Sequence, residues 1–289
     1  METLGGSFKD LVIQALQISG PFEKITENNV YQRAVPEIMP LLDKISDALL
    51  LPGSCIRGFE YLADAYAKAM EGYSCLLCLE HYSNLDLPIF SYLLRKEGEL
   101  GKTIDSALVA IAGMKLSEMN PAVAAFTAGF TRIVIYPSRS LAGLDAVKSR
   151  DEILRSNSIN RAAMKSLLDV KNQGKLILVF PSGTRYRPWD PGTKRGVREI
   201  DSYIKSFDYM CPVAINGEVL HIRPGDMLDD FVSRGVVRMT AGPVLYCSGF
   251  RERAREDAEA AGMKDKKQAT ADALMRILER MHTEAELNG

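Results

Sequence analysis

Two residues of the chain have the types and spacing of an acid–base pair. His81 is followed five positions later by Asp86. Imidazole is the side chain best suited to take up a proton near neutral pH, and a carboxylate on its second ring nitrogen would fix the tautomer and stabilise the imidazolium. We interpret His81 as a general base and Asp86 as its partner. The alternative is structural, because Asp86-Leu87-Pro88 also has the pattern of a helix start with aspartate as the N-cap.

A second group of residues is suited to bind an anion. The apolar run Leu176 to Phe180 leads into Pro181-Ser182-Gly183-Thr184-Arg185-Tyr186-Arg187-Pro188, and Arg139 follows another apolar run in the same way. Proline and glycine shape a turn whose backbone N–H groups can form an anion-binding nest, and guanidinium groups bind phosphate oxygens in pairs. A turn with solvated arginines is the alternative interpretation. The position directly after apolar runs favours a phosphate site built from Arg139, Arg185 and Arg187.

Strands and helices in alternation must position these groups. Six short apolar runs have the length of buried strands, and segments with helical spacing or helix-forming composition separate most of them. The runs are Cys75 to Leu79, Ser106 to Ala112, Arg132 to Tyr136, Leu176 to Phe180, Pro212 to Ile215 and Val236 to Val244. This alternation predicts an α/β fold with a largely parallel or mixed central sheet flanked by helices. Ligands bind at the carboxyl ends of strands in such sheets, so the candidate residues are expected to lie together.

The first 73 residues contain no convincing strand. They predict helices over Asp10 to Ile18, Ile38 to Leu51 and Ile56 to Met70, and the stretch around Val30 also looks helical. We therefore divide the chain into an N-terminal helical domain, residues 1–73, and an α/β domain with C-terminal helices, residues 74–289. The chain from Phe250 onward is charged and rich in alanine, which predicts C-terminal helices with solvated faces.

Composition excludes several classes of protein. A net charge of -1 disfavours a general nucleic-acid binder. No apolar run approaches the ~20 residues of a membrane span, and the first residues lack the basic start and apolar core of a signal peptide. We predict a cytoplasmic protein whose membrane contact, if any, is peripheral. Cys75 and Cys78 form a CxxC inside an apolar run, so buried structural cysteines are expected rather than a redox or metal site.

The same residues resemble a known family. The stretch His81 to Asp86 resembles the HX4D motif of glycerolipid acyltransferases, and Phe180 to Pro188 resembles their FPEGTR motif with Ser182 in place of glutamate. The order Ser-Gly-x-Arg-x-Arg-Pro is most similar to the soluble plastid-type glycerol-3-phosphate acyltransferases. The resemblance covers about Gly72 to Pro224. It departs from that branch where Arg139-Ser140 replaces a Lys-His pair and where Thr184 replaces glycine.

The resemblance implies an activity in phospholipid biosynthesis. A fatty acyl group would pass from a thioester of acyl carrier protein or coenzyme A to the 1-hydroxyl of glycerol 3-phosphate, without a metal or redox cofactor. His81 would take the hydroxyl proton and Asp86 would orient it. Three arginines would hold the phosphate, and the turn at Ser182-Gly183 would offer N–H groups to the oxyanion; the three arginines are Arg139, Arg185 and Arg187.

Other interpretations stay open. The acceptor could be 1-acylglycerol 3-phosphate, which would make phosphatidic acid the product. Ser182 could instead be the nucleophile of a serine hydrolase, although the chain has no GxSxG elbow, or the chain could be a phosphate- or lipid-binding module without catalysis. Several basic residues could contact an acidic acyl carrier protein or form a solvated face; they are Lys148, Arg150, Lys194, Arg195 and Arg198.

Overall fold

A mixed, mostly parallel sheet of nine strands forms the centre of the molecule. The computed structural model describes residues 1–21, 23–114, 121–137, 140 and 150–287. The strand order is β2-β6-β5-β7-β4-β8-β11-β3, with β12 beside β8. The strands are β2 (Tyr31–Gln32), β3 (Cys55–Arg57), β4 (Cys75–Leu79), β5 (Leu108–Gly113), β6 (Arg132–Ile135), β7 (Leu176–Val179), β8 (Tyr209–Asn216), β11 (Arg238–Ala241) and β12 (Leu245–Tyr246). Strands β6, β5, β7, β4 and β8 are parallel to their neighbours in that series, which confirms the predicted fold class.

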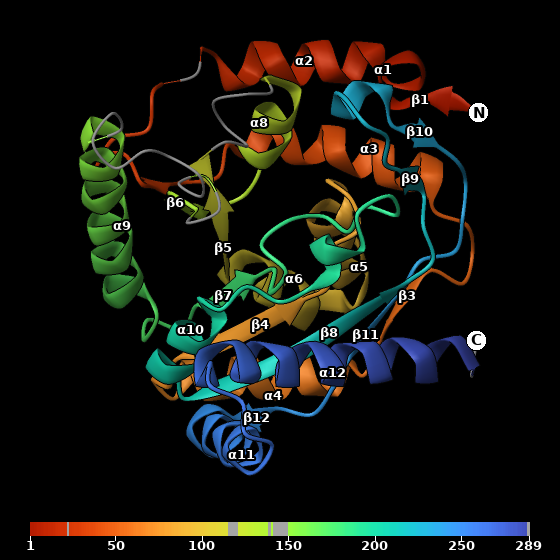
Figure 1. Cartoon of the computed structure of the whole chain (residues 1–289). Coiled ribbons are helices and arrows are strands. Elements are labelled where there is room, and N and C mark those ends of the chain that lie inside the picture. Colours follow the sequence, from red (N-terminus) through yellow and green to blue (C-terminus); the bar gives the residue numbers. More distant parts are fainter. Residues whose placement is uncertain (22, 115–120, 138–139, 141–149, 288–289) are drawn as a thin grey trace.

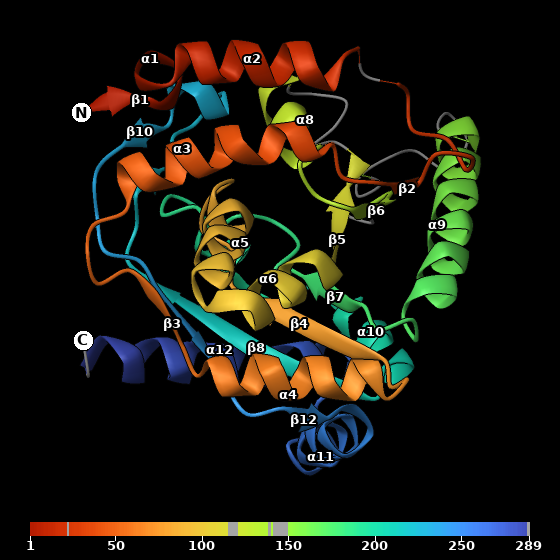
Figure 2. The ribbon, with the colours of Figure 1, turned by 180° about the vertical axis from the view of Figure 1, so that it is seen from behind.

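Helices cover both faces of this sheet (Figures 1 and 2). One face carries α3 (Met39–Leu49), α4 (Phe59–Met70), α5 (Asp86–Lys96), α6 (Gly98–Ala107) and α8 (Pro121–Thr127). The other carries α9 (Arg150–Val170), α10 (Ile200–Ser206), α11 (Cys247–Ala260) and α12 (Lys266–Leu287). The first helices, α1 (Leu4–Ser7) and α2 (Lys9–Ser19), lie near a small sheet of β1 (Glu2–Thr3), β10 (Phe231–Val232) and β9 (Leu220–His221).

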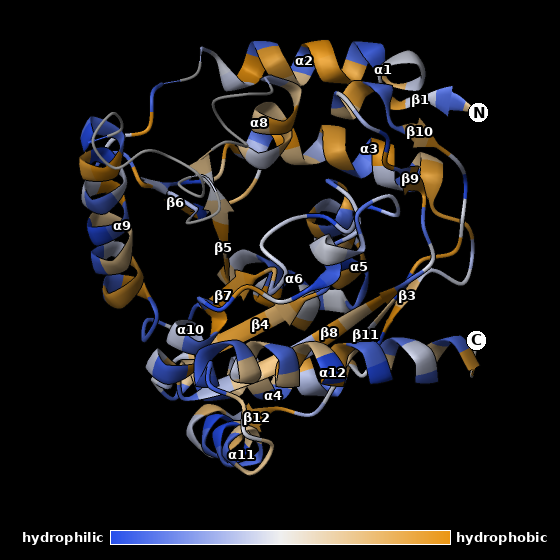
Figure 3. Cartoon of the chain, in the orientation of Figure 1, coloured by the Kyte–Doolittle hydropathy of each residue, from blue (hydrophilic) through white to orange (hydrophobic). Residues whose placement is uncertain are grey.

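Strand β4 shows why its apolar run is continuous. All five of its residues are buried, and their side chains alternate between two hydrophobic clusters. Cys75, Leu77 and Leu79 belong to the cluster beneath α3, α4 and α5, whereas Leu76 and Cys78 face α9 to α12. A strand covered by helices on both faces has no polar side to display. Figure 3 shows the result as strands with mainly hydrophobic colouring, β4 and β7 among them, surrounded by helices of mixed colouring.

The N-terminal region contributes strands as well as helices. Strand β2 pairs antiparallel with β6, and β3 pairs parallel with β11. The expectation of no strand before residue 74, and of helix around Val30, is therefore wrong. Strands of two or three residues are too short to show a period of two, and their partners lie far along the chain. The predicted domain boundary at residue 73 stays a prediction.

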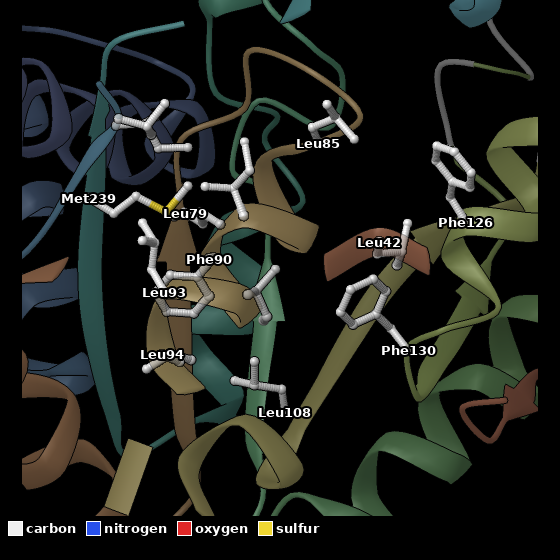
Figure 4. Packing of buried hydrophobic residues seen from close by; sticks show 14 of the residues in the cluster. Leu42, Leu79, Leu85, Phe90, Leu93, Leu94, Leu108, Phe126, Phe130 and Met239 are labelled. Carbon is white, nitrogen blue, oxygen red and sulfur yellow. The ribbon is translucent and has the colours of Figure 1, made fainter. Parts of the chain in front are cut away.

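The N-terminal helices share a hydrophobic cluster with the helices that follow β4 and β5. Leu42 of α3 lies beside Phe126 and Phe130, and Phe90 of α5 lies close to Leu79 of β4 (Figure 4). Leu42, Leu79 and Phe90 each have 1% or less of their surface exposed. Helix α5, which carries Asp86, is thus anchored by fully buried apolar side chains.

The C-terminal helices are attached through a buried carboxylate. Asp201 of α10 is 1% exposed and accepts hydrogen bonds from Arg251 Nε at 2.8 Å, Arg255 Nη2 at 3.0 Å and Thr270 Oγ1 at 3.0 Å. Burial alone would raise the pKa of Asp201, but the bonds from Arg251 and Thr270 lower it below its usual value. Asp201 therefore fixes α11 and α12 to the helix that packs against the sheet beside β7.

Candidate active site

His81 and Asp86 meet at the carboxyl end of β4. The Nδ1 atom of His81 lies 2.9 Å from Asp86 Oδ2, and the two side chains are 13% and 5% exposed. Asp86 is the first residue of α5, and its carboxylate also accepts hydrogen bonds from the backbone N–H groups of Tyr82 at 2.6 Å and Ser83 at 2.9 Å. The N-cap position belongs to Leu85, and no side chain caps the helix. The predicted N-cap role of Asp86 is therefore wrong, because its carboxylate folds back onto the loop that precedes the helix.

The pair leaves one imidazole nitrogen for chemistry. With Nδ1–H donating to Asp86, the Nε2 atom carries the lone pair that can accept a proton. The imidazole ring stacks on Phe180 with a centroid distance of 3.9 Å and an interplanar angle of 21°. Asp86 and Phe180 together restrict both the rotation and the tilt of the ring. This arrangement has the geometry of a general base with its orienting carboxylate.

A second polar network adjoins His81 and was missed at the sequence level. Glu80 is 4% exposed, and its Oε2 accepts the backbone N–H of Ile215 at 2.8 Å. His282 Nδ1 of α12 lies 3.2 Å from the same oxygen, and the Tyr82 hydroxyl donates to Glu80 Oε1 at 3.2 Å. The hydrogen bond with Glu80 is the main cause that raises the pKa of His282. The sequence did show a glutamate, Glu80, at the end of an apolar run. Its partner His282 could not be inferred, because it lies 202 residues later in the chain.

The turn after β7 is tied to the loop that carries the histidine. The Tyr186 N–H donates to the His81 carbonyl at 2.8 Å, and the Gly183 N–H donates to the Phe180 carbonyl at 2.8 Å. Gly183 has a φ of +64°, which glycine adopts without strain. The Ser182 hydroxyl donates to the Thr184 carbonyl at 2.7 Å. Of the predicted oxyanion donors, the Gly183 N–H is thus already bonded within the turn.

The predicted phosphate-binding arginines have different surroundings. Arg185 Nη1 lies 3.2 Å from Asp230 Oδ2, a carboxylate with 1% exposure whose pKa is raised by burial. The backbone N–H of Arg187 donates to Thr193 Oγ1 at 2.8 Å, and within the described residues its guanidinium has no carboxylate partner. Arg139 lies outside the described residues. The structure therefore places two of the three arginines on one turn and leaves the third unplaced.

A large apolar cavity borders His81 on the α9 and α10 side of the sheet. It has a volume of about 300 Å³. Its walls come from β5, β6, β7, α9 and α10 and include Ile111, Ile133, Leu167, Val179 and Ile200. The few polar groups on this wall include Asn160, whose amide is held by the backbone of Tyr136. The cavity can hold an extended apolar group with one end at the imidazole.

A smaller cavity borders His81 on the opposite face of the sheet. Its volume is about 70 Å³, and it lies between β5, α5 and α8. Its apolar walls include Leu87, Ala110, Val123 and Phe126, and His81, Ile111 and Phe180 line both cavities. His81 therefore lies where two cavities on opposite faces of the sheet meet.

Other expected features can be placed as well. Cys75 and Cys78 are fully buried in β4, as predicted, and burial raises the pKa of the Cys75 thiol to about 12. Lys194, Arg195 and Arg198 each pair with an acidic residue of the C-terminal segment, namely Glu279, Asp272 and Asp265. Lys148 lies outside the described residues. Among the helices that the structure describes, none is both long and apolar enough to cross a membrane.

Comparison with known proteins bears on the same region. A family model described as "Acyltransferase" matches residues 60–216, more than half of the chain's 289 residues. The matched range runs from α4 to the end of β8 and includes His81, Asp86 and the turn after β7. Among curated proteins, the search found no match.

Proposed function

The chain belongs to the acyltransferase family, within the glycerolipid acyltransferases, and we propose that it transfers a fatty acyl group from a thioester to the 1-hydroxyl of glycerol 3-phosphate. The observation that carries the proposal is the His81–Asp86 pair, at 2.9 Å, beside an apolar cavity of about 300 Å³. Transfer of a fatty acyl group to a hydroxyl needs a base, and it needs an apolar space for the acyl chain beside that base.

The chemistry follows from where charge develops. His81 Nε2 takes the proton of the acceptor hydroxyl as its oxygen attacks the thioester carbonyl. Asp86 stays ionised and stabilises the imidazolium. The tetrahedral intermediate then collapses, the carbon–sulfur bond breaks, and the thiolate leaves and takes the proton back from His81. Positioned proton transfer of this kind accelerates a reaction by about 10²–10⁴-fold.

The larger cavity is the proposed site of the acyl chain. Its walls are mainly apolar, and Leu167 and Ile200 on them belong to the hydrophobic cluster on this face of the sheet. Each methylene that leaves water contributes about 0.8 kcal/mol, so a cavity of this kind favours long acyl groups. The thioester carbonyl would lie at the His81 end.

Arg185 and Arg187, with Arg139, are the proposed phosphate ligands at the carboxyl end of the sheet. Asp230 holds the Arg185 guanidinium in one orientation, at 3.2 Å. The acyl donor is a thioester of acyl carrier protein or coenzyme A. The ion pairs of Lys194, Arg195 and Arg198 with acidic residues favour the interpretation of these three as a solvated face rather than a docking surface for an acidic carrier.

One assay tests the proposal. Purified protein is incubated with a labelled acyl thioester and either glycerol 3-phosphate or 1-acylglycerol 3-phosphate. Faster product formation with glycerol 3-phosphate supports the proposal. Preference for the monoacyl acceptor would replace it with phosphatidic acid synthesis, and release of free fatty acid without acceptor would favour the hydrolase interpretation.

A further inference from the structure

The main chain leaves the sheet directly before His81, at the buried residue Glu80. Strand β4 is paired with β8 up to Leu79, and the Glu80 N–H still donates to the Val213 carbonyl at 3.1 Å. In a continuing parallel ladder, the next bond would join the Ile215 N–H to the Glu80 carbonyl. The Glu80 carboxylate accepts this bond instead, through Oε2 at 2.8 Å. The Glu80 carbonyl is thereby released from the ladder, and the chain turns out of the sheet at His81.

The Glu80 carboxylate needs a counter-charge, because an isolated buried anion is strongly unfavourable. Glu80 is 4% exposed, and within the described residues its ion-pair partner is His282 of α12, whose Nδ1 lies 3.2 Å from Oε2. The Tyr82 hydroxyl donates to the other carboxylate oxygen at 3.2 Å and lies 3.3 Å from the same Nδ1. Burial raises the pKa of this hydroxyl, so it stays a donor at neutral pH.

This network reaches the dyad from both sides of His81. Glu80 precedes the histidine in the chain, and Tyr82 follows it. Tyr82 is bonded to Glu80 through its hydroxyl and to Asp86 Oδ2 through its backbone N–H, at 3.2 Å and 2.6 Å. His282 therefore contacts both neighbours of the base, and through them it can fix the position of the imidazole.

Helix α12 holds His282 in this place. The helix packs along β8 (Figures 1 and 2), and the Asn216 side chain of that strand donates to the His282 carbonyl at 2.9 Å. Two other charged groups lie near the imidazole. Glu286, one turn later on α12, has its Oε1 atom 3.3 Å from Nε2, and Lys194 of the segment after β7 pairs with Glu279. Both are more exposed than the carboxylate at Nδ1, which is therefore the main partner of the imidazole.

We propose that His282 is a positioning residue for the His81 base: it balances the charge of Glu80, whose carboxylate turns the main chain out of the sheet. This inference rests on the proposed function. It adds to the site a group from α12, which lies beyond residue 216, where the family match ends. Without His282, the buried carboxylate must take up a proton or move toward water, and either change weakens its bond with the Ile215 N–H. The loop of His81 then loses its fixed position.

Separate measurement of kcat and KM tests the proposal. In His282→Leu, kcat should fall about 10- to 100-fold, the effect of a small displacement of a catalytic group, while the KM of each substrate stays within about twofold. His282→Asn keeps an amide donor near the position of Nδ1 but no charge, so its kcat should lie between those of His282→Leu and wild type. A rise in KM without loss of kcat, or unchanged kinetics, overturns the proposal. Should His282→Leu fail to fold, His282→Asn decides by the same criterion.

Thr270→Val is the matched control for the attachment of α12. Thr270 lies on the same helix and also donates to a buried carboxylate, Asp201 Oδ1 at 3.0 Å. Its substitution should lower the thermal unfolding midpoint and leave kcat unchanged. An equal loss of kcat in Thr270→Val and His282→Leu would mean that attachment of the helix alone matters, which refutes a specific role of His282.

A double variant tests the route through Glu80. In Glu80→Gln there is no charge to balance, so adding His282→Leu should lower kcat less than about twofold further. If His282→Leu costs the same factor in Glu80→Gln as in wild type, His282 does not act through Glu80 and the proposal is wrong.

A signal of the dyad itself makes the result independent of acyl transfer. The Nδ1–H proton of His81, bonded to Asp86 in a side chain that is 13% exposed, should give a slowly exchanging imidazole N–H resonance in NMR spectra, assigned by its loss in His81→Ala. This resonance should broaden in His282→Leu and stay sharp in Thr270→Val. That result supports the positioning role even if wild type transfers no acyl group and the proposed function fails.

Two outcomes of the NMR experiment contradict the inference. A resonance equally sharp in wild type, His282→Leu and Thr270→Val removes the positioning role and leaves the proposed function intact. Absence of the resonance from wild type contradicts the protected His81–Asp86 bond, and with it the inference.

Discussion

The two cavities that border His81 differ in size and in the chemistry of their walls. The one beneath α9 and α10 has about 300 Å³ and mainly apolar walls with several polar side chains, whereas the one beneath α5 and α8 has about 70 Å³ and is lined by apolar residues together with His81, Asn84 and Arg132. The imidazole of His81, stacked on Phe180, lines both. The difference in volume teaches that the larger cavity is the one with room for an extended acyl chain, as proposed above. The predictions below test this comparison.

The largest effect on the rate is expected for the loss of His81, which lines both cavities. His81→Ala removes the base that both substrates would need, so the rate should fall about 10⁴-fold or more, from the loss of proton transfer together with its positioning. Acyl transfer by the purified variant is measured beside its thermal unfolding. Activity above a few per cent of wild type in a folded variant would exclude His81 as the base.

Asp86→Asn should reduce the rate about 10³–10⁴-fold, somewhat less than loss of the imidazole, because the tautomer and the counter-charge of His81 are both lost. The amide can replace only part of the carboxylate, which accepts bonds from His81 and from the backbone of Tyr82 and Ser83. Unfolding midpoints measured alongside the rate distinguish loop damage from lost chemistry. A rate equal to wild type would mean that Asp86 only holds the loop.

Filling the larger cavity should change chain-length preference. Ala163 of α9 lines that cavity and is 2% exposed. Ala163→Leu removes space for a few methylenes, and each methylene left unburied lowers kcat/KM about fourfold, from about 0.8 kcal/mol per group. The rate is measured with thioesters of increasing chain length.

Val123→Leu is the matched control for Ala163→Leu because Val123 lines only the smaller cavity. It should leave the chain-length profile unchanged. The opposite pattern, with Val123→Leu shifting the chain-length profile, would place the acyl chain in the smaller cavity.

Loss of an arginine from the turn after β7 should weaken binding of the acceptor but not of the acyl donor. Arg187 has no carboxylate partner in the described structure, so Arg187→Ala removes a charge without freeing an acid, whereas Arg185→Ala would leave Asp230 unpaired. We expect the KM for glycerol 3-phosphate to rise about tenfold in Arg187→Ala, the equivalent of one charge-assisted bond, with an unchanged KM for the thioester. Steady-state kinetics with each substrate varied in turn measure both values. A change in the donor KM instead would place Arg187 on the donor side.

The smallest effect is expected on stability, from His282, which links α12 to Glu80. The hydrogen bond with Glu80 raises the pKa of His282 in the folded state, so the protonated form is the one that folding favours. Its contribution to stability, about 1 kcal/mol for one such bond, is fully present below the unfolded pKa of about 6.5 and is lost as pH rises through the folded pKa. The free energy of unfolding of wild type minus His282→Gln should therefore shrink as pH increases.

His221→Gln serves as the reference for the His282 measurement, since His221 contacts Ser233 and Glu218 and no residue of the dyad. Its difference from wild type should not follow the pH dependence seen for His282→Gln. A difference for His282→Gln that grows with pH would contradict the assigned direction of the pKa shift.

The amino-acid sequence by itself determined the parts that local patterns encode. The continuous apolar runs of β4, β5, β6, β7 and β8 identified the central strands, because strands buried on both faces have no polar side chains to interrupt them. The residue types His81, Asp86, Ser182 and Arg185 predicted a base, its orienting carboxylate and an anion-binding turn, because these functions depend on side-chain chemistry within a few positions. Helix α6 and the three short N-terminal strands β1, β2 and β3 were not predicted from these patterns.

Only the tertiary structure decided which groups meet and which stay unpaired. Glu80 and His282 contact each other across most of the chain, and Asp230 neutralises Arg185 from a distant loop. In the sequence Arg132 only begins an apolar strand run, and the structure shows that it is buried without a carboxylate partner among the described residues. The two cavities likewise exist only between elements brought together by folding. Pairing, burial and empty space are properties of three-dimensional neighbours, and short-range patterns along a chain do not record them.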